Sequence, residues 1–380
     1  MRLTKGPISG GRSAGRPGVP LQAETGGGFG GKEEYPSILA IHAALLARRI
    51  GRPVRMIYDR HEDIAATTKR HPAVVTHRTG VTRDGRLVAQ DIEVVMDAGA
   101  YATLSPVVLS RGALHAGGPY RCPNVRIRAR TMARNMPPSG AFRGFGAPET
   151  EFAAEMQVNG SPRRSAFRAE VEARTGLPFR ESYRTDAREH GPSRADVRFV
   201  GYPGIEWDQA TFRGDAYPCY SWAAAVAAVD VDLDTGEVAV RSVVAVDEAG
   251  RIVNPVLAAG QVEGGTLQAV GYATIEEMQV ERGRYVNDRF ATYLIPTALD
   301  APEIRALFAE DPFAGVPHGA KGLGELPMDV GAPAVIAAIH DATGAWIHEL
   351  PATPERVLAA ILEAEEGVAP AAGVIPEPHR

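Results

Sequence analysis

Residues 74–96 read VVTHRTGVTRDGRLVAQDIEVVM, and this stretch decides the fold class of the first half of the 380-residue chain. Apolar and polar residues alternate on both sides of Asp84-Gly85, and such a pair between two alternating runs is a strong signal for a tight hairpin turn. A second stretch of this kind, VAAVDVDLDTGEVAVRSVVAV, covers residues 226–246 and turns at residues 234–236. The sequence therefore predicts one long antiparallel hairpin in each half, with strands at residues 74–82, 87–96, 226–233 and 238–246.

Helical patterns flank both hairpins. Apolar residues recur on one face of residues 37–49, at Ile38, Ile41, Ala44 and Leu45, and residues 51–53 (Gly-Arg-Pro) form a stop signal. Further helices are expected near residues 264–272, at residues 334–342 with Pro333 at the start, and at residues 354–364; short strands are expected at residues 19–24 and 54–58. Hairpins with packed helices in each half predict an α+β fold instead of a doubly wound parallel sheet.

Residue composition and apolar periodicity along the chain suggest five segments. Residues 159–196 are crowded with Arg, Glu, Ser and Pro and carry little apolar periodicity apart from a possible short helix near residues 166–174. We therefore expect a loose N-terminal segment (1–18), a first domain (19–158), an irregular connection (159–199), a second domain (200–366) and a flexible tail (367–380).

Charge and cysteine content exclude several classes of function. The chain has 41 Lys and Arg against 46 Asp and Glu, a net charge of −5 that does not favour a nucleic-acid partner. Two cysteines, Cys122 and Cys219, are too few for a disulfide scaffold, a zinc site or an iron–sulfur cluster. Electrons from any redox reaction must therefore leave through another chain or a diffusible acceptor. No signal peptide or membrane span is apparent, so a cytoplasmic location is expected.

Glycine and proline are enriched, with 41 and 29 residues respectively, and much of the glycine falls in loops. Loop 1, residues 26–33, reads GGGFGGKE. It fits the P-loop spacing, but Glu33 stands where Ser or Thr would hold magnesium. It also fits the dinucleotide-binding spacing, yet the acidic residue expected about 20 positions later is absent. A tight structural turn and a ligand-binding loop both remain open for this segment.

Two further glycine-rich loops follow. Loop 2, residues 139–148, reads SGAFRGFGAP; its Phe142 and Phe145 suit either core packing or a flat ligand with an anionic group near Arg143. Loop 3, residues 321–327, reads KGLGELP, and Glu325 is either a solvated surface carboxylate or a general base with a raised pKa. The residues alone thus predict three loops suited to a large, flat, anionic ligand.

Together, GGGFGGKE, GAFRGFGAP and KGLGELP resemble the molybdenum-binding subunit of the xanthine dehydrogenase and aldehyde oxidase family. Weaker similarity runs through residues 230–238 (DVDLDTGEV), 254–255 (NP), 260–265 (GQVEGG) and 292–297 (TYLIPT). The resemblance covers about residues 20–157 and 200–363. It implies two molybdenum-cofactor-binding α+β domains with long β-hairpins and packed helices.

The resemblance also implies roles for individual residues. Glu325 matches the catalytic base of a hydroxylation that uses water. No protein side chain is expected to bind the metal, and the cofactor is molybdenum–molybdopterin, either alone or as its cytosine dinucleotide. The 2Fe–2S clusters and FAD are expected on partner subunits. The residues that match cofactor-contacting positions of the family are Gly28, Phe29, Gly30, Ala141, Phe142, Arg143 and Gln261.

Three residues match substrate-contacting positions of the family. Glu33 and Arg111 match a carboxylate and a guanidinium that orient a heterocycle in purine-oxidising members, and Phe145 matches a ring that stacks on a planar substrate. The expected substrate is therefore a purine-like or xanthine-like N-heterocycle, with an aldehyde as the alternative. The carbon-monoxide-oxidising branch is disfavoured, since it has a cysteine where this chain has Gly144.

The chain departs from the family in length. Family subunits are considerably longer, and the resemblance leads us to expect that an N-terminal part and a central G-Q-G-type cofactor loop are missing. We therefore expect the isolated chain to bind cofactor weakly. A truncated, non-catalytic remnant or interaction protein with an incomplete cofactor site is the alternative, and a nucleotide-binding protein that uses loop 1 ranks third.

Overall fold

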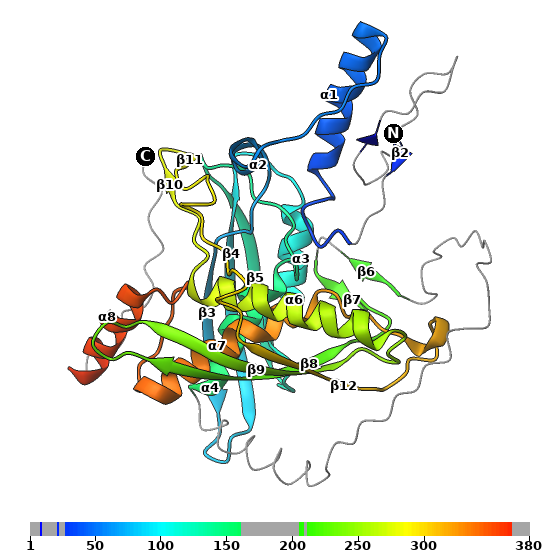
Figure 1. Ribbon diagram of the computed structural model, residues 1–380. Helices are drawn as coiled ribbons and strands as arrows, with labels where there is room; N and C mark the ends of the chain where they lie inside the picture. The colour runs from blue at the N-terminus through cyan, green and yellow to red at the C-terminus, as the bar shows by residue number, and fades with distance from the viewer. Residues whose placement is uncertain (1–7, 10–20, 23–26, 161–204, 209–210, 367–380) are drawn as a thin grey trace.

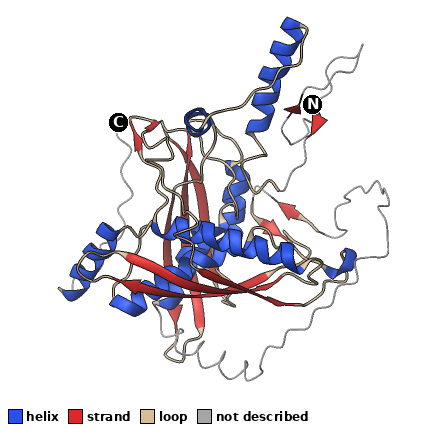
Figure 2. Ribbon diagram, viewed as in Figure 1, coloured by secondary structure: helices blue, strands red, loops and turns tan. Residues whose placement is uncertain are grey.

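A computed structural model describes residues 8–9, 21–22, 27–160, 205–208 and 211–366 (Figure 1). Long strands and helices are both present, and the strands form two separate three-stranded sheets, each with helices packed against it (Figure 2). The predicted α+β class is therefore confirmed. The predicted connection at residues 159–199, including the possible helix at residues 166–174, lies almost wholly outside the described residues.

The first sheet has the order β3-β4-β5. Strands β3 (Ala73–Val81) and β4 (Leu87–Gly99) form the hairpin that the alternating pattern predicts, and Gly85 supplies the positive φ of 83° in its turn. The chain then passes through helix α3 (Ser105–His115) and returns as β5 (Val125–Ala133), which pairs with β4 in parallel.

The second sheet repeats this arrangement. Strands β8 (Trp222–Val231) and β9 (Val238–Glu248) form the second predicted hairpin. Helix α6 (Pro255–Thr274) then leads to β12 (Glu303–Ala309), which is parallel to β9. In both sheets the central strand is thus antiparallel to its hairpin partner and parallel to a third strand that follows a helix.

The shared topology gives loops 2 and 3 equivalent positions. Loop 2 follows β5 and leads into helix α4 (Ala147–Asn159), while loop 3 follows β12 and leads into helix α7 (Leu326–Thr343). Each helix has proline in its first turn, where a missing N–H costs no hydrogen bond. Helices α4 and α7 also contact each other, so the two loops lie at the starts of two packed helices.

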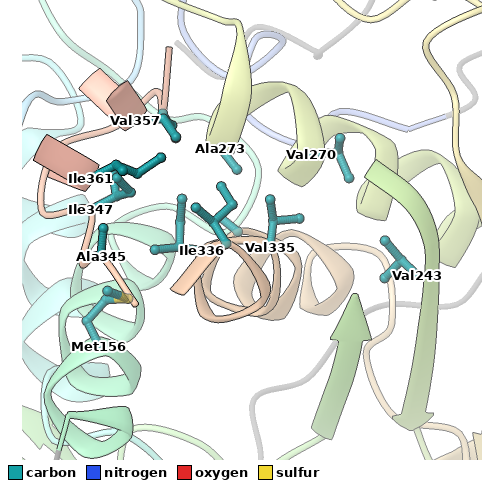
Figure 3. Packing of buried hydrophobic residues seen from close by; sticks show 13 residues of the cluster. Met156, Val243, Val270, Ala273, Val335, Ile336, Ala345, Ile347, Val357 and Ile361 are labelled. Atoms are coloured by element: carbon teal, nitrogen blue, oxygen red, sulfur yellow. The ribbon is translucent and has the colours of Figure 1, made fainter. Parts of the chain in front are cut away.

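The main hydrophobic core joins the two halves. Its centre is α7, whose Val335 and Ile336 are fully buried (Figure 3). Val243 of β9 and Met156 of α4 pack into the same cluster, as do residues of α6 and of helix α8 (Pro354–Glu365). Because α4 ends the first half and still packs against α7, burial of apolar surface fixes one half against the other.

The first helix begins earlier than predicted and lies in an unexpected setting. Helix α1 spans Tyr35–Ile50 and ends at Gly51, whose φ is 64°. It projects away from the two sheets (Figure 1), and its predicted apolar face is exposed: Ile38, Ile41 and Leu45 are 41%, 44% and 59% exposed. The helical periodicity is confirmed, but among the described residues little covers that face.

Two sequence predictions need correction. Residues 54–58 form no strand, since no neighbouring strand pairs with them in the described part of the chain. The chain forms helix α2 (Arg60–Ala66) just afterwards, stabilised by a capping box between Asp59 and Glu62. Pro333 does not begin a helix but lies inside α7, where packing of α7 against α6 and the second sheet outweighs the lost hydrogen bond.

The remaining elements are short. The predicted strand at residues 19–24 is described only as β2 (Leu21–Gln22), which pairs with β1 (Ile8–Ser9). The predicted helix at residues 354–364 is confirmed as α8, and that near residues 264–272 as the longer α6. The other short elements are β6 (Trp207–Asp208), β7 (Arg213–Gly214), β10 (Val280–Glu281), β11 (Arg284–Tyr285) and η1 (Pro317–Gly319).

Candidate functional site

Loops 1, 2 and 3 meet in one place, and glycines allow their backbones to touch. Gly30 of loop 1 has a φ of 115° and abuts loop 2 so closely that a Cβ added to it would lie 2.6 Å from the Cα of Phe142. The Phe29 ring packs on loop 3 in the same way, because a Cβ at Gly324 would lie 2.7 Å from Phe29 Cζ. Three segments that are far apart in sequence are therefore held in direct contact.

Arg143 fastens the three loops to helix α6. This side chain is buried, and its guanidinium lies 4.8 Å from the centre of the Phe29 ring. Its Nε donates to the Gly324 carbonyl at 2.5 Å, and its Nη1 and Nη2 donate to Gln268 Oε1 at 3.0 Å and the Gln261 carbonyl at 3.1 Å. All of these acceptors are neutral, and the carboxyls that interact electrostatically with the guanidinium are those of Glu325 and Asp329.

Glu325 lies where loop 3 becomes α7, beside Arg143 and Gly144. Burial raises the pKa of its carboxyl, and the nearby Glu33 raises it further. A hydrogen bond from the Gly144 backbone and the charges of Arg143 and Arg70 oppose this shift. The structure thus gives Glu325 the raised pKa and the positive neighbours that a general base needs.

A second carboxyl, Asp329, lies one turn further along α7. Its Oδ1 is enclosed and has no hydrogen-bond partner among the described residues, and a Cβ at Gly144 would lie 2.5 Å from it. Burial raises its pKa well above the usual range, and the charges of Glu151 and Glu325 add to the effect. The sequence analysis missed this residue, although its spacing of four from Glu325 places both on one face of a helix.

Glu33 and Arg111, the two residues expected to orient a heterocycle, each have an enclosed polar atom without a partner in the described part of the chain. These atoms are Glu33 Oε2 and Arg111 Nη1. Arg111 comes from α3, and its guanidinium lies 4.8 Å from the centre of the Tyr217 ring. An unused acceptor and an unused donor are thus available near the base.

Phe145 occupies a different setting from the other predicted residues. Its backbone is in the left-handed region, with a φ of 56°, and the residue packs against the hydrophobic cluster of the first sheet, which includes Ile92 and Met96. Part of the ring surface is therefore used for packing, and its predicted role toward a substrate stays a prediction.

Arg70 binds the backbone of loop 2, a role that the sequence analysis did not predict. Its Nη2 donates to the Arg143 carbonyl at 2.6 Å, and its Nη1 donates to the Phe145 carbonyl at 3.0 Å. It also pairs with buried Glu149 at 3.4 Å and lies 4.6 Å from the centre of the Phe142 ring. An arginine more than 70 positions from its partners carries no local sequence signal, so only the folded chain reveals it.

A cavity of about 1620 Å³ opens beside the three loops. Loop 1 glycines, Phe142, Arg143 and α6 line one part of it. Its wall carries both basic side chains, among them Lys32, Arg60 and Lys69, and acidic ones, among them Asp63, Glu276 and Glu277. Arg60 Nε is enclosed without a partner among the described residues, and burial lowers the pKa of Lys69 to about 8. Gly31 and Gly264 have open space where a side chain would be, so their backbones face the cavity freely. The cavity is large enough for a cofactor-sized ligand, and its lysines and arginines could pair with an anionic group of that ligand.

The described residues give no sign of a protein-held metal or a membrane segment. They contain no group of three or more His, Cys, Asp or Glu side chains placed to bind a metal ion. None of the helices at residues 27–160 or 205–366 that the structure describes is long and apolar enough to cross a membrane.

Comparisons with known proteins identify the family of the two halves of the chain. Two protein-family models, each described as a molybdopterin cofactor-binding domain, match residues 21–163 and 147–302. The chain is 25% identical to a probable xanthine dehydrogenase subunit of Bacillus subtilis, covering 90% of the chain and 68% of the relative. It is 45% identical to the nicotinate dehydrogenase large molybdopterin subunit of Eubacterium barkeri, over 37% of the chain and 32% of the relative.

Solved structures show the same fold. The aldehyde oxidoreductase of Desulfovibrio desulfuricans matches 90% of the chain and 54% of its own length with a TM-score of 0.73 at 21% identity. Quinoline 2-oxidoreductase of Pseudomonas putida matches 90% of the chain and 68% of its own length with a TM-score of 0.70 at 23% identity.

The chain covers these relatives only in part. It spans about a third of the nicotinate dehydrogenase subunit and about half of the aldehyde oxidoreductase. The alignment with the Bacillus protein runs over 512 residues, more than the 380 of this chain, so that relative carries internal residues that have no counterpart here. With two molybdopterin-binding domain matches that together span most of its length, the chain belongs to the molybdopterin-binding oxidoreductase family of the xanthine dehydrogenase and aldehyde oxidase type.

Proposed function

We propose that the chain is the molybdopterin-binding part of a hydroxylase that acts on an electron-poor carbon of an N-heterocycle. The net reaction converts R–H and water to R–OH, two protons and two electrons. The observation that carries this proposal is the convergence of Glu325 with loops 1 and 2 around Arg143. Arg143, which lies beside this carboxyl of raised pKa, lines a cavity of about 1620 Å³.

The residues of the cavity and loops suit the cofactor. The backbone of Gly28 and Gly30 and the side chains of Phe29 and Arg143 would hold its metal end, together with Ala141, Phe142 and Gln261. Lys32, Arg60 and Lys69 would hold its phosphate, in the simple or the cytosine dinucleotide form. When bound, molybdenum–molybdopterin supplies the two-electron acceptor, and iron–sulfur and FAD subunits would carry the electrons onward.

Glu325 would accept the proton that leaves as water becomes the product hydroxyl. A base must be ionised to act, so activity should rise with pH through the raised pKa of this carboxyl and fall below it. The acid limb of the pH profile should therefore lie closer to neutrality than that of an ordinary surface glutamate.

Glu33 and Arg111 support a heterocyclic substrate. Glu33 Oε2 can accept a hydrogen bond from a ring N–H, and Arg111 Nη1 can donate one to a ring nitrogen or carbonyl. The names of several relatives point the same way, since xanthine, nicotinate and quinoline are all N-heterocycles. An aldehyde is the second candidate, because aldehyde oxidases are also among the relatives.

A non-catalytic remnant or interaction protein is the alternative function. The observation that favours it is the 512-residue alignment, which shows that a relative has internal residues absent from this chain. Such residues could complete the cofactor site in that relative.

Glu325→Gln tests the catalytic proposal in a complex assembled with iron–sulfur and FAD subunits. We expect turnover of xanthine to fall by at least a hundredfold while molybdenum content stays unchanged. Asp247→Asn is the matched control, since Asp247 is a fully buried carboxyl on β9 outside the three loops. Turnover retained in Glu325→Gln, or lost equally in Asp247→Asn, would refute the assignment of Glu325.

A further inference from the structure

Tyr217 lies beside the candidate base and takes no part in the proposed proton transfer. It precedes β8, and its ring lies against the Arg111 guanidinium at 4.8 Å. The ring also contacts His115 of α3 and meets Tyr220 edge-on, with ring centres 6.2 Å and 5.5 Å apart. The Arg111 guanidinium thus lies over the Tyr217 ring, and His115 and Tyr220 are further neighbours of that ring.

The candidate base also contributes to the electrostatic environment of the Tyr217 ring. Burial raises the pKa of Tyr217, Arg111 lowers it, and the charges of Glu325 and Asp329 raise it further. Tyr217 is therefore within range of the base, the buried second carboxyl and the guanidinium at once.

The site lacks a fully available ring elsewhere among the described residues of the three loops. Phe145 packs against the hydrophobic cluster of the first sheet, Phe29 contacts Arg143 and Gly324, and one face of the Phe142 ring is covered by the Arg70 guanidinium at 4.6 Å. Arg111 Nη1 and Glu33 Oε2 nevertheless stay enclosed without a hydrogen-bond partner in the described part of the chain, so a donor and an acceptor remain for a ligand.

We propose that Tyr217 forms the aromatic wall of the substrate pocket and holds Arg111 in position to bind a planar heterocycle. The inference rests on the proposed function and names a specificity-determining residue for it. When a guanidinium stacks on an aromatic ring, its N–H groups point outward in a plane parallel to that ring, where an acceptor on the substrate can reach them. The exposed part of the Tyr217 ring adds a flat surface that favours aromatic substrates over small aliphatic aldehydes.

The test compares Tyr217→Leu with Tyr217→Phe. In the assembled complex we expect Tyr217→Leu to raise KM for xanthine about tenfold with kcat nearly unchanged, and to leave KM for acetaldehyde within about twofold. Tyr217→Phe keeps the ring and should keep KM for xanthine near the parent value. Tyr220→Leu is the matched control, because Tyr220 touches Tyr217 but has no contact with Arg111 among the described residues.

A binding measurement separates this inference from the proposed function. Calorimetric titration of xanthine into each variant of the complex with oxidised cofactor and no electron acceptor gives the Kd without turnover. We expect about tenfold weaker binding for Tyr217→Leu than for Tyr217→Phe or Tyr220→Leu. Equal Kd values for all variants would overturn the role of Tyr217, even if the enzyme turns xanthine over. Weaker xanthine binding by Tyr217→Leu alone, in a complex that shows no turnover, would support Tyr217 and refute the proposed reaction. Circular dichroism of each variant shows whether a loss of binding reflects unfolding. If Tyr217→Leu is unfolded, Tyr217→Trp replaces it in the test, and restored xanthine binding in that variant supports the aromatic ring as the group that matters.

Discussion

Gly30→Ala should be strongly destabilising, because Gly30 is where loop 1 touches loop 2. Its φ of 115° is disfavoured for any residue with a side chain. The added methyl group would lie 2.6 Å from the Cα of Phe142 and also meet the Ala141 carbonyl oxygen. Both contacts are with backbone atoms, which cannot rotate away as a flexible side chain could.

The magnitude follows from two contributions. A non-glycine residue in such a backbone conformation costs about 1–3 kcal/mol. Overpacking by one methyl group against a rigid neighbour costs about 1–3 kcal/mol more. We therefore expect the free energy of unfolding to fall by about 2–6 kcal/mol, a large share of the stability of a typical domain.

Gly51→Ala is the matched control. Gly51 ends α1 with a φ of 64°, but no atom lies within 4 Å of the position that its Cβ would take. Only the conformational cost of about 1 kcal/mol should remain. Urea denaturation followed by circular dichroism gives both values, and hydrogen exchange at residues 27–33 and 140–146 shows where the loss is localised. If Gly30→Ala costs no more than Gly51→Ala, loops 1 and 2 do not touch and the three-loop site is wrong.

Two further predictions concern the core. Burial raises the pKa of Asp247 from 3.8 to about 7, so its contribution to stability is complete below pH 4 and lost as pH rises toward 7. Asp247→Asn should remove this pH dependence and raise the free energy of unfolding at pH 8 by up to about 4 kcal/mol. Urea denaturation at pH 4 and pH 8 measures the effect, and an unchanged pH dependence in the variant would contradict the prediction. Gly331→Ala should separate α7 from α6 and cost about 1–3 kcal/mol, because its methyl group would lie 2.5 Å from Ala269 Cβ. In the control Gly260→Ala on α6, the added methyl group meets no atom within 4 Å, so this variant should be more stable than the parent by up to about 1 kcal/mol. Equal melting temperatures for Gly331→Ala and Gly260→Ala would refute the packing of α7 against α6.

Local patterns predicted most of the regular structure. The two hairpins follow from alternation around Asp84-Gly85 and Asp234-Thr235-Gly236, because period-2 burial and turn chemistry are local properties. Residues 54–58 show the limit of this reasoning: their composition suits a strand, but a strand also needs a partner. The capping box of Asp59 and Glu62, which the sequence analysis did not consider, stabilises the helix that forms there.

The site could be predicted only in part. Loops 1, 2 and 3 stand out by their glycine and by the family resemblance, yet nothing local shows that Arg143 hydrogen-bonds Gly324, 181 positions away. Arg70 and Tyr217 escaped notice for the same reason, since their contacts join distant segments. The exposure of the apolar face of α1 was also hidden, because periodicity shows that a face is apolar and not what covers it.

The central claim is that the three loops and the cavity beside them hold molybdenum–molybdopterin. The most direct measurement is the molybdenum and pterin content of the chain produced together with iron–sulfur and FAD subunits, for the parent and for Arg143→Leu. We predict close to one molybdenum and one pterin per parent chain, and a loss of both in Arg143→Leu, because that variant removes the guanidinium that joins loop 2 to loop 3 and α6. A folded parent chain without molybdenum or pterin, or an Arg143→Leu variant that keeps both, would contradict the account.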